Sequence, residues 1–166
     1  MPAKEFVSPM ARFVHQLITQ SRMVCAEKPA LIFKQHALTY PQLCETLYSY
    51  AGCLAGLGLQ RHERIAVYLP KCPEAVLSLF ATSAAGGVFV PVNHVLKAPQ
   101  VQHILGDCDV SMLITSSDRA KALREVLPEC PKLRHVILVD KMIELDIPQQ
   151  IHLLADLQSQ TNTVPV

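Results

Sequence analysis

The feature that most constrains the fold is an alternation of short apolar runs with stretches of helical periodicity between residues 65 and 139. Four such runs predict strands, and they lie at residues 65–69, 88–92, 110–115 and 136–139. The first is continuously apolar, as expected of a strand that is covered on both faces. The intervening segments have the length and apolar spacing of helices, and they lie at residues 73–85, 98–106 and 117–127. Strands joined by helices require right-handed crossovers, so we predict an α/β fold with a mostly parallel sheet and helices on both faces.

Residues before this alternation predict a helical and hairpin-forming extension. Apolar residues recur at helical spacing over residues 10–23, and residues 30–33 and 37–39 flank a polar turn typical of a short hairpin. Thr39 followed by Gln42 has the form of a capping box, so a long helix is expected to begin there. Gly58 stands where a left-handed helix end is expected.

The end of the chain differs in composition, being rich in Gln. Pro148 is expected to open a short helix with Ile151, Leu154 and Leu157 turned inward, and a linker or tail is expected beyond Gln158. We therefore predict an α/β subdomain over residues 10–140, followed by a short helix and linker over residues 141–166.

Composition excludes several classes of protein. The 166 residues suffice for one domain, and the net charge of +1 with interspersed signs offers no basic stripe for a nucleic acid. The six cysteines form no Cys-x-x-Cys pair and the N-terminus lacks an apolar signal core, so structural thiols and a cytoplasmic location are expected. Residues 75–92 are uncharged, but Gly86-Gly87 interrupts them, which favours a buried helix and strand over a transmembrane span.

Motifs that carry chemistry are missing from the sequence. It contains no P-loop, no dinucleotide fingerprint and no nucleophile elbow, and the seven histidines show no paired metal spacing. Gly86-Gly87 precedes a strand, so a tight helix-to-strand turn is the favoured interpretation. Polar residues that follow predicted strands are the best candidates for a ligand site, because ligands gather at the carboxyl ends of parallel strands. The first of these candidates is His94, which follows the strand that ends at Val92. The others are Pro70, Lys71, Asn93, Ser116 and Ser117.

Position alone is a weak reason to assign a site, and loop polarity with helix capping explains these candidates more simply. The residues themselves therefore predict a scaffold with no catalytic, cofactor-binding or metal-binding residue.

The order of several segments resembles the start of the adenylate-forming, AMP-binding superfamily. Residues 29–33 and 38–43 resemble its opening "ALTYxEL" segment, and residues 57–70 look like its "GLxxGDRVAVxLP" segment. Residues 83–93 are similar to "KAGGVYVPLN", and residues 100–116 to "EEIAYILxDSGAKVLIT". The resemblance covers residues 13–140 without a gap.

Within this superfamily the sequence is most similar to acyl-CoA ligases. Residues 67–71 and 96–110 resemble the ligases associated with exosortase systems. There are two departures from the family pattern. His62-Glu63 replaces the usual Gly-Asp, and His94 follows Asn93 where the family commonly has Pro or another small or polar residue. Both fall in turns and leave the predicted fold intact.

The resemblance implies a two-step reaction, in which a carboxylic acid of the fatty-acid kind reacts with ATP to form an acyl-adenylate and coenzyme A then displaces AMP. ATP, Mg²⁺ and coenzyme A are the implied cofactors of the parent enzyme. The glycine-rich loop and the mobile-domain lysine of the family have no matching position here, so we expect this chain alone to be inactive. Its expected partner is the remainder of the ligase.

Two alternatives remain open at this stage. One is a non-enzymatic stub that acts as an interaction or self-association module through exposed surfaces. The other is a small regulator of the receiver type, which would need an acidic cluster at the strand ends that the sequence does not show.

Overall fold

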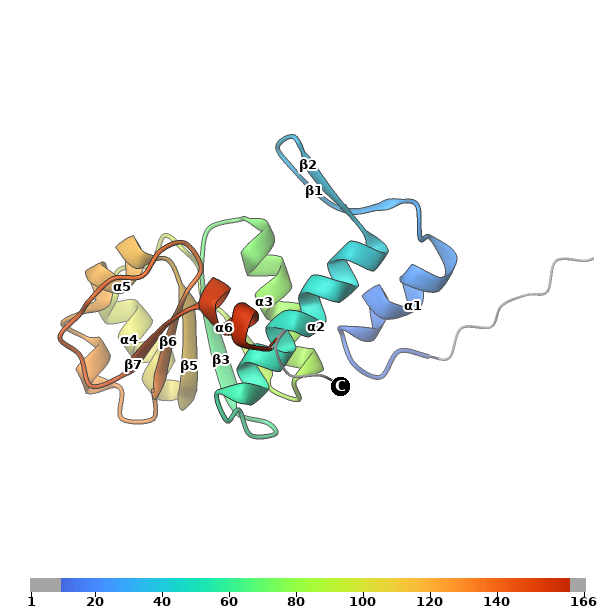
Figure 1. The fold of residues 1–166 in the computed structure, drawn as a ribbon. Coiled ribbons are helices and arrows are strands. Elements are labelled where there is room, and N and C mark those ends of the chain that lie inside the picture. Colours follow the sequence, from blue (N-terminus) through green and yellow to red (C-terminus); the bar gives the residue numbers. More distant parts are fainter. Residues whose placement is uncertain (1–9, 162–166) are drawn as a thin grey trace, which may run out of the picture.

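A computed structural model describes residues 10–161 and contains a five-stranded sheet covered by helices on both faces (Figure 1). The strands are β3 (Arg64–Tyr68), β4 (Val88–Pro91), β5 (Val110–Thr115), β6 (His135–Leu138) and β7 (Gln150–Leu153). Their spatial order is β4-β3-β5-β6-β7, and every neighbouring pair is parallel. The predicted α/β fold with a parallel sheet is confirmed.

The helices divide between two faces of this sheet. One face packs against α2 (Tyr40–Gly56), α3 (Pro73–Ala84) and α6 (Leu154–Thr161), and the other packs against α4 (Ala98–Asp107) and α5 (Ser117–Leu123). Side chains of a strand alternate between the two faces, so each strand supplies both cores. Thus Ile65 and Val67 contribute to the first core, while Ala66 and Tyr68 contribute to the second.

The predicted hairpin and long helix are confirmed at the N-terminal side. Strands β1 (Pro29–Phe33) and β2 (His36–Thr39) pair antiparallel and project beyond the main sheet (Figure 1). The Gln42 Oε1 atom accepts a hydrogen bond of 2.9 Å from the Thr39 N–H, as a capping box requires. Gly58 has a φ of 79° just after α2, which is the left-handed helix end expected there.

The predicted turn at Gly86-Gly87 is also confirmed. Gly86 has a φ of 83°, a conformation in which other residues are strained. A Cβ atom on Gly87 would lie only 3.2 Å from the Glu63 carbonyl oxygen and 3.1 Å from side-chain atoms of Leu59 and Thr82. The turn therefore needs glycine for two separate reasons.

Two predicted helices differ from those observed. Helix α1 (Gln16–Val24) begins at Gln16 and not at residue 10, because the residues before it have little core to pack against. Its buried residue is Ile18. Helix α5 ends at Leu123, followed by a 3₁₀ turn (Leu127–Glu129), so the prediction of a helix through residue 127 was too long. The ring of Pro128 would clash with the Arg124 carbonyl in a continued α-helix.

The prediction for the end of the chain was wrong in its element type. Residues from Pro148 onward do not open a helix, because β7 pairs with β6 and turns Ile151 and Leu153 toward the α4/α5 side. Helix α6 follows directly, with Leu154 and Leu157 packed toward the α2 side as predicted, and it continues beyond Gln158. Residues 162–166 lie outside the described part. The division of the chain at residues 140 and 141 stays a prediction.

Two properties of the described residues bear on the classes considered above. Among residues 10–161, no helix is both long and apolar enough to cross a bilayer. The six cysteines form no disulfide bond, and Cys44, Cys53 and Cys130 are buried in the cores.

Candidate functional site

Two hollows lie at the carboxyl edge of the sheet. After β3 the chain enters α3 on one face, whereas after β4 it enters α4 on the opposite face. Ligands of open α/β sheets lie in a crevice outside the carboxyl ends of the strands, and β3 and β4 end at such a crevice. The switch point of this strand order lies beside it, between β3 and β5.

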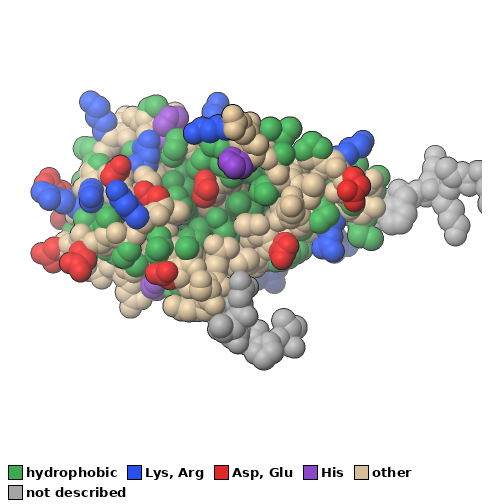
Figure 2. Space-filling view, turned by 45° about the horizontal axis from the view of Figure 1, so that its top comes forward, with side chains coloured by type: hydrophobic (Ala, Val, Ile, Leu, Met, Phe, Trp, Pro, Cys, Tyr) green, Lys and Arg blue, Asp and Glu red, His purple; other side chains and the backbone are tan. Residues whose placement is uncertain are grey.

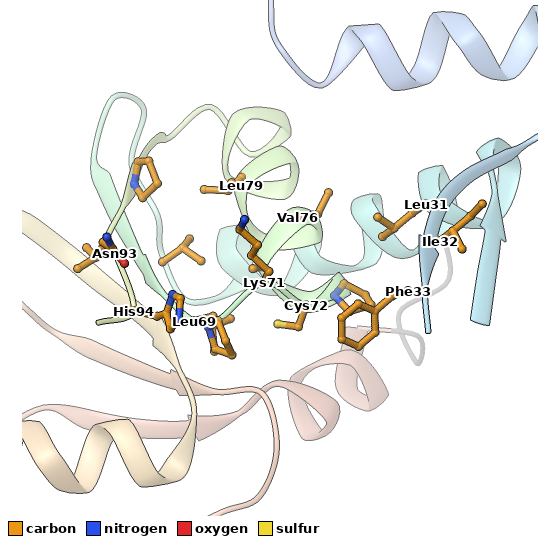
Figure 3. A pocket seen from close by; sticks show the side chains of 16 residues that line it. Leu31, Ile32, Phe33, Leu69, Lys71, Cys72, Val76, Leu79, Asn93 and His94 are labelled. Carbon is orange, nitrogen blue, oxygen red and sulfur yellow. The ribbon is translucent and has the colours of Figure 1, made fainter. Parts of the chain in front are cut away.

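A pocket of about 600 Å³ occupies this crevice. Its walls come from the end of β3 and the start of α3, from the end of β4, and from β1 of the hairpin. Figure 3 shows Leu31, Ile32 and Phe33 on one side, Asn93 and His94 on the other, and Lys71 and Cys72 between them.

Apolar side chains dominate the lining of this pocket. Val67, Leu69, Val76 and Leu79 join the hairpin residues, and the polar residues are few. None of the described residues that line it is Asp or Glu. Figure 2 shows hydrophobic side chains across the middle of one face, with charged side chains mostly toward the left of the view and some at its right end. The pocket therefore suits an apolar ligand or an apolar protein segment.

The loop after β4 is held in place by contacts from two other elements. The Tyr68 hydroxyl donates a hydrogen bond of 2.6 Å to the Leu96 carbonyl, and Arg119 Nη1 donates one of 2.6 Å to the His94 carbonyl. The Arg119 guanidinium also lies 4.7 Å from the centre of the Tyr68 ring, within the range of a cation–π contact. Asn93 accepts a hydrogen bond from the Val95 N–H at 3.2 Å, as in an Asx turn. The loop that carries His94 is therefore held by side-chain hydrogen bonds to its backbone.

Cys72 is the one thiol in the pocket wall among the described residues. Burial raises its pKa, and a hydrogen bond with the Glu74 side chain acts in the same direction. A thiol with a raised pKa is protonated at neutral pH and is a poor nucleophile. Cys72 is therefore the N-cap residue of α3 and not a reactive group.

A second hollow of about 440 Å³ lies between the carboxyl ends of β3 and β5. Pro70, Ser116 and Arg119 contribute to its lining. Ser117 lines neither hollow; its N–H and its Oγ each donate a hydrogen bond of 2.8 Å to the Asp140 carboxylate. Burial alone would raise the pKa of Asp140, but these hydrogen bonds lower it overall.

The structure thus brings together four of the six sequence candidates in one pocket: Pro70, Lys71, Asn93 and His94. It places Ser116 at the N-cap position of α5, although the Ser116 side chain makes no capping hydrogen bond. Sequence reasoning missed the hairpin wall, because the hairpin is separated from β3 by the whole of α2. It also missed His135 and His152, which lie on adjacent strands with ring nitrogens 3.1 Å apart.

Comparison with known families is decisive for the assignment. Residues 19–163 match the family described as AMP-binding enzyme, which is most of the chain. The chain belongs to the AMP-binding enzyme family. The resemblance found in the sequence is confirmed at this level, and the family match extends through β7 and α6, which that resemblance did not reach.

Relatives of this chain include CoA ligases. It is 28% identical over 130 residues to a long-chain-fatty-acid–CoA ligase of Bacillus subtilis, covering 78% of this chain and 22% of that protein. It is 28% identical over 146 residues to a crotonobetaine/carnitine–CoA ligase of Salmonella agona, covering 84% of this chain and 28% of that protein. The chain therefore spans about a quarter of the length of these relatives.

Solved structures share the fold. An anthranilate CoA ligase in complex with anthranoyl-AMP superposes with a TM-score of 0.80 at 22% identity, covering 92% of this chain and 29% of that one. A benzoate CoA ligase from Burkholderia xenovorans gives 0.75 at 20% identity, covering 90% of this chain and 28% of that one. The five-stranded sheet of this chain thus matches part of an adenylate-forming fold.

Proposed function

We propose that this chain is the N-terminal segment of an AMP-forming acyl-CoA ligase, which activates a carboxylic acid as an acyl-adenylate and transfers it to coenzyme A. The observation that carries the proposal is the apolar pocket at the carboxyl ends of β3 and β4, within a chain that matches the AMP-binding family. The pocket supplies a shaped wall and no acid–base pair, so this segment contributes scaffold and not catalysis.

The residues that line this pocket do not fit ATP or Mg²⁺. Magnesium prefers carboxylate and other oxygen ligands, and a triphosphate needs backbone donors or cationic side chains around it. The pocket lining has no carboxylate and Lys71 as its one Lys or Arg, among the residues that the structure describes. ATP, Mg²⁺ and coenzyme A therefore belong to the parent enzyme in this proposal, and this chain alone is inactive.

The proposed partner is the remainder of the ligase, in the same chain or supplied separately. Ile32 is 67% exposed in the pocket wall, and Leu31 and Phe33 beside it are half-buried at best. Apolar walls of this kind are ordinarily covered in a complete protein. We also propose a fatty acid as the substrate, a cytoplasmic location and a place among the exosortase-associated ligases, on the sequence resemblance.

Two measurements test the proposal together. The first is ATP–pyrophosphate exchange by the purified chain with octanoate, palmitate and benzoate, beside a complete acyl-CoA ligase as the positive control. We expect no exchange above background from the chain alone, and exchange after addition of the downstream ligase segment from the native source. Exchange by the chain alone would overturn the assignment of a non-catalytic scaffold.

The second measurement is the intact mass of the native product by immunoblot and mass spectrometry. A species several times longer than 166 residues is expected for a ligase. A stable native product of 18.4 kDa that gains no activity from the downstream segment would withdraw the ligase function for this chain.

A second candidate function is a self-associating module without enzyme activity. The observation in its favour is a group of exposed apolar side chains around α1 and the hairpin, which includes Phe13 at 54%, Leu17 at 57% and Ile32 at 67% exposure. Sedimentation velocity at rising concentration separates the two candidates. A discrete dimer at micromolar concentration that persists beside the downstream segment would favour the module.

A further inference from the structure

The parallel pairing of β6 and β7 brings two histidines together. Ile137 lies opposite His152 in the register of these strands, and His135 precedes Ile137 by two residues. Residues two apart on a strand point to the same face, so His135, Ile137 and His152 share one face of the sheet. Ile137 belongs to the core on the α2 side, which identifies that face.

The distance between the two imidazoles suits a shared metal ion. His135 Nδ1 and His152 Nε2 are 3.1 Å apart, and the ring centres are 5.2 Å apart with planes inclined by 46°. At metal–nitrogen bonds of about 2.0–2.1 Å, two nitrogens on one ion are about 2.9 Å apart at a right angle and about 3.3 Å apart at the tetrahedral angle. The observed distance lies between these two values.

We propose that His135 and His152 form a two-histidine site for a borderline divalent metal ion. Imidazole nitrogens suit Cu²⁺, Ni²⁺ and Zn²⁺, and Cu²⁺ is expected to bind most tightly of the three. No group of three or more ligating side chains occurs among residues 10–161. Water therefore fills the other coordination positions, and the affinity is that of a two-ligand chelate, below that of a structural zinc site. Both histidines are half-buried, so water reaches the site.

The surroundings of the pair are compatible with a cation. After burial and His152, the positive charge of Arg134 lowers the pKa of His135, and Glu63 offsets that charge through two hydrogen bonds of 2.7 and 3.0 Å with Arg134. Burial lowers the pKa of both histidines, which favours the neutral imidazoles that metals bind. The direct hydrogen bond between the rings is what the metal would replace.

A metal in this position would join the last two strands of the sheet. His152 lies on β7, the strand at the sheet edge, and α6 begins two residues later. Since a ligand that binds only the folded state stabilises it, the ion should slow amide exchange in β7 and α6.

The test is isothermal titration of Cu²⁺, Ni²⁺ and Zn²⁺ into the untagged full chain at neutral pH, with its thiols alkylated under native conditions. We expect one saturable equivalent, tightest for Cu²⁺, with slower amide exchange across residues 150–161. The variants H135Q and H152Q should each lose that equivalent, because Gln keeps hydrogen-bonding capacity but not the nitrogen ligand. The control is His103→Gln, since His103 is exposed on α4 and its loss should leave binding unchanged.

Circular dichroism and the urea midpoint of each variant without metal show whether it is folded. The proposal is overturned if a folded H152Q variant binds as the wild-type chain does, or if the wild-type chain shows no saturable binding. Binding that disappears equally in the His103 variant would also overturn it, because it would indicate non-specific surface coordination.

Discussion

The edge of the sheet at which its strands begin (the amino edge) and the edge at which they end (the carboxyl edge) are built differently. At the amino edge, the turn before β4 is tied to the turn before β3, since His62 donates to the Gly86 carbonyl at 2.9 Å and Val88 donates to the Glu63 carbonyl at 2.8 Å. Arg134 adds a two-point ion pair with Glu63. At the carboxyl edge, the chain leaves β3 and β4 toward opposite faces of the sheet, beside an open apolar pocket of about 600 Å³. The contacts at the amino edge thus hold the strands together, whereas the carboxyl edge is open to a ligand or a partner segment.

The largest effect is expected at the amino edge, from Gly86→Ala. A Cβ on Gly86 would meet no atom closer than 4.0 Å, so the cost comes from its φ of 83° alone. We expect a loss of about 1–2 kcal/mol in the free energy of unfolding. Urea unfolding followed by circular dichroism measures it.

The matched control is Gly106→Ala, because Gly106 lies inside α4 with open space around it. That variant should be stabilised, by up to about 1 kcal/mol. If both variants lose stability equally, the amino-edge turn has no special requirement for glycine.

A smaller effect is expected at the carboxyl edge from Asp140→Asn. Asp140 accepts two hydrogen bonds from Ser117, and its removal should cost about 1 kcal/mol or less at neutral pH, since the carboxylate is exposed. Because the folded pKa of Asp140 is lowered, its contribution is complete above the unfolded pKa of about 3.9 and is lost as the pH falls through the folded value.

Urea midpoints of the wild-type chain and of D140N between pH 3 and 7 test this pH dependence. The two curves should converge at the acid end. The exposed carboxylate Asp146 provides the control, and D146N should follow the wild-type chain. Parallel curves for D140N and the wild-type chain would contradict the role given to Ser117.

The smallest effect is expected within the open pocket, from Ile32→Ser. Ile32 is already 67% exposed, so the free energy of unfolding should change by no more than about 0.5 kcal/mol. Leu31→Ser is the comparison, because Leu31 packs against the first core and its loss should cost more. If I32S proves as costly as L31S, the pocket wall is part of the core and the two edges are less different than described.

The first four strands of the sheet were predicted well from the sequence, whereas the last strand, β7, and the end of α5 were not. The continuous apolar run at residues 65–69 predicted a buried strand, and the structure confirms it as β3. Residues 150–153 were misassigned because a short apolar segment beside Pro148 fits a helix as well as a strand, and only pairing with β6 decides between them. The end of α5 was misplaced because the effect of Pro128 on the preceding turn was not applied.

The candidate site was predictable in part for a related reason. Lys71 and His94 follow strands directly, so topology alone places them at one edge. Ile32 and its neighbours reach the same pocket through the packing of a separate hairpin, which no local pattern reveals. The contact between His135 and His152 depends on the register of two parallel strands, and a search for helical spacing of ligands cannot find it.

The strand order has a consequence for how the chain folds as it leaves the ribosome. Strand β3 is made first in this sheet, and β4 and β5 then take their places on its two sides. Strands β6 and β7 follow in the order of synthesis, each beside the strand made just before it. The nascent sheet therefore grows outward by addition at an exposed edge, and no later strand has to be inserted between two that have already paired.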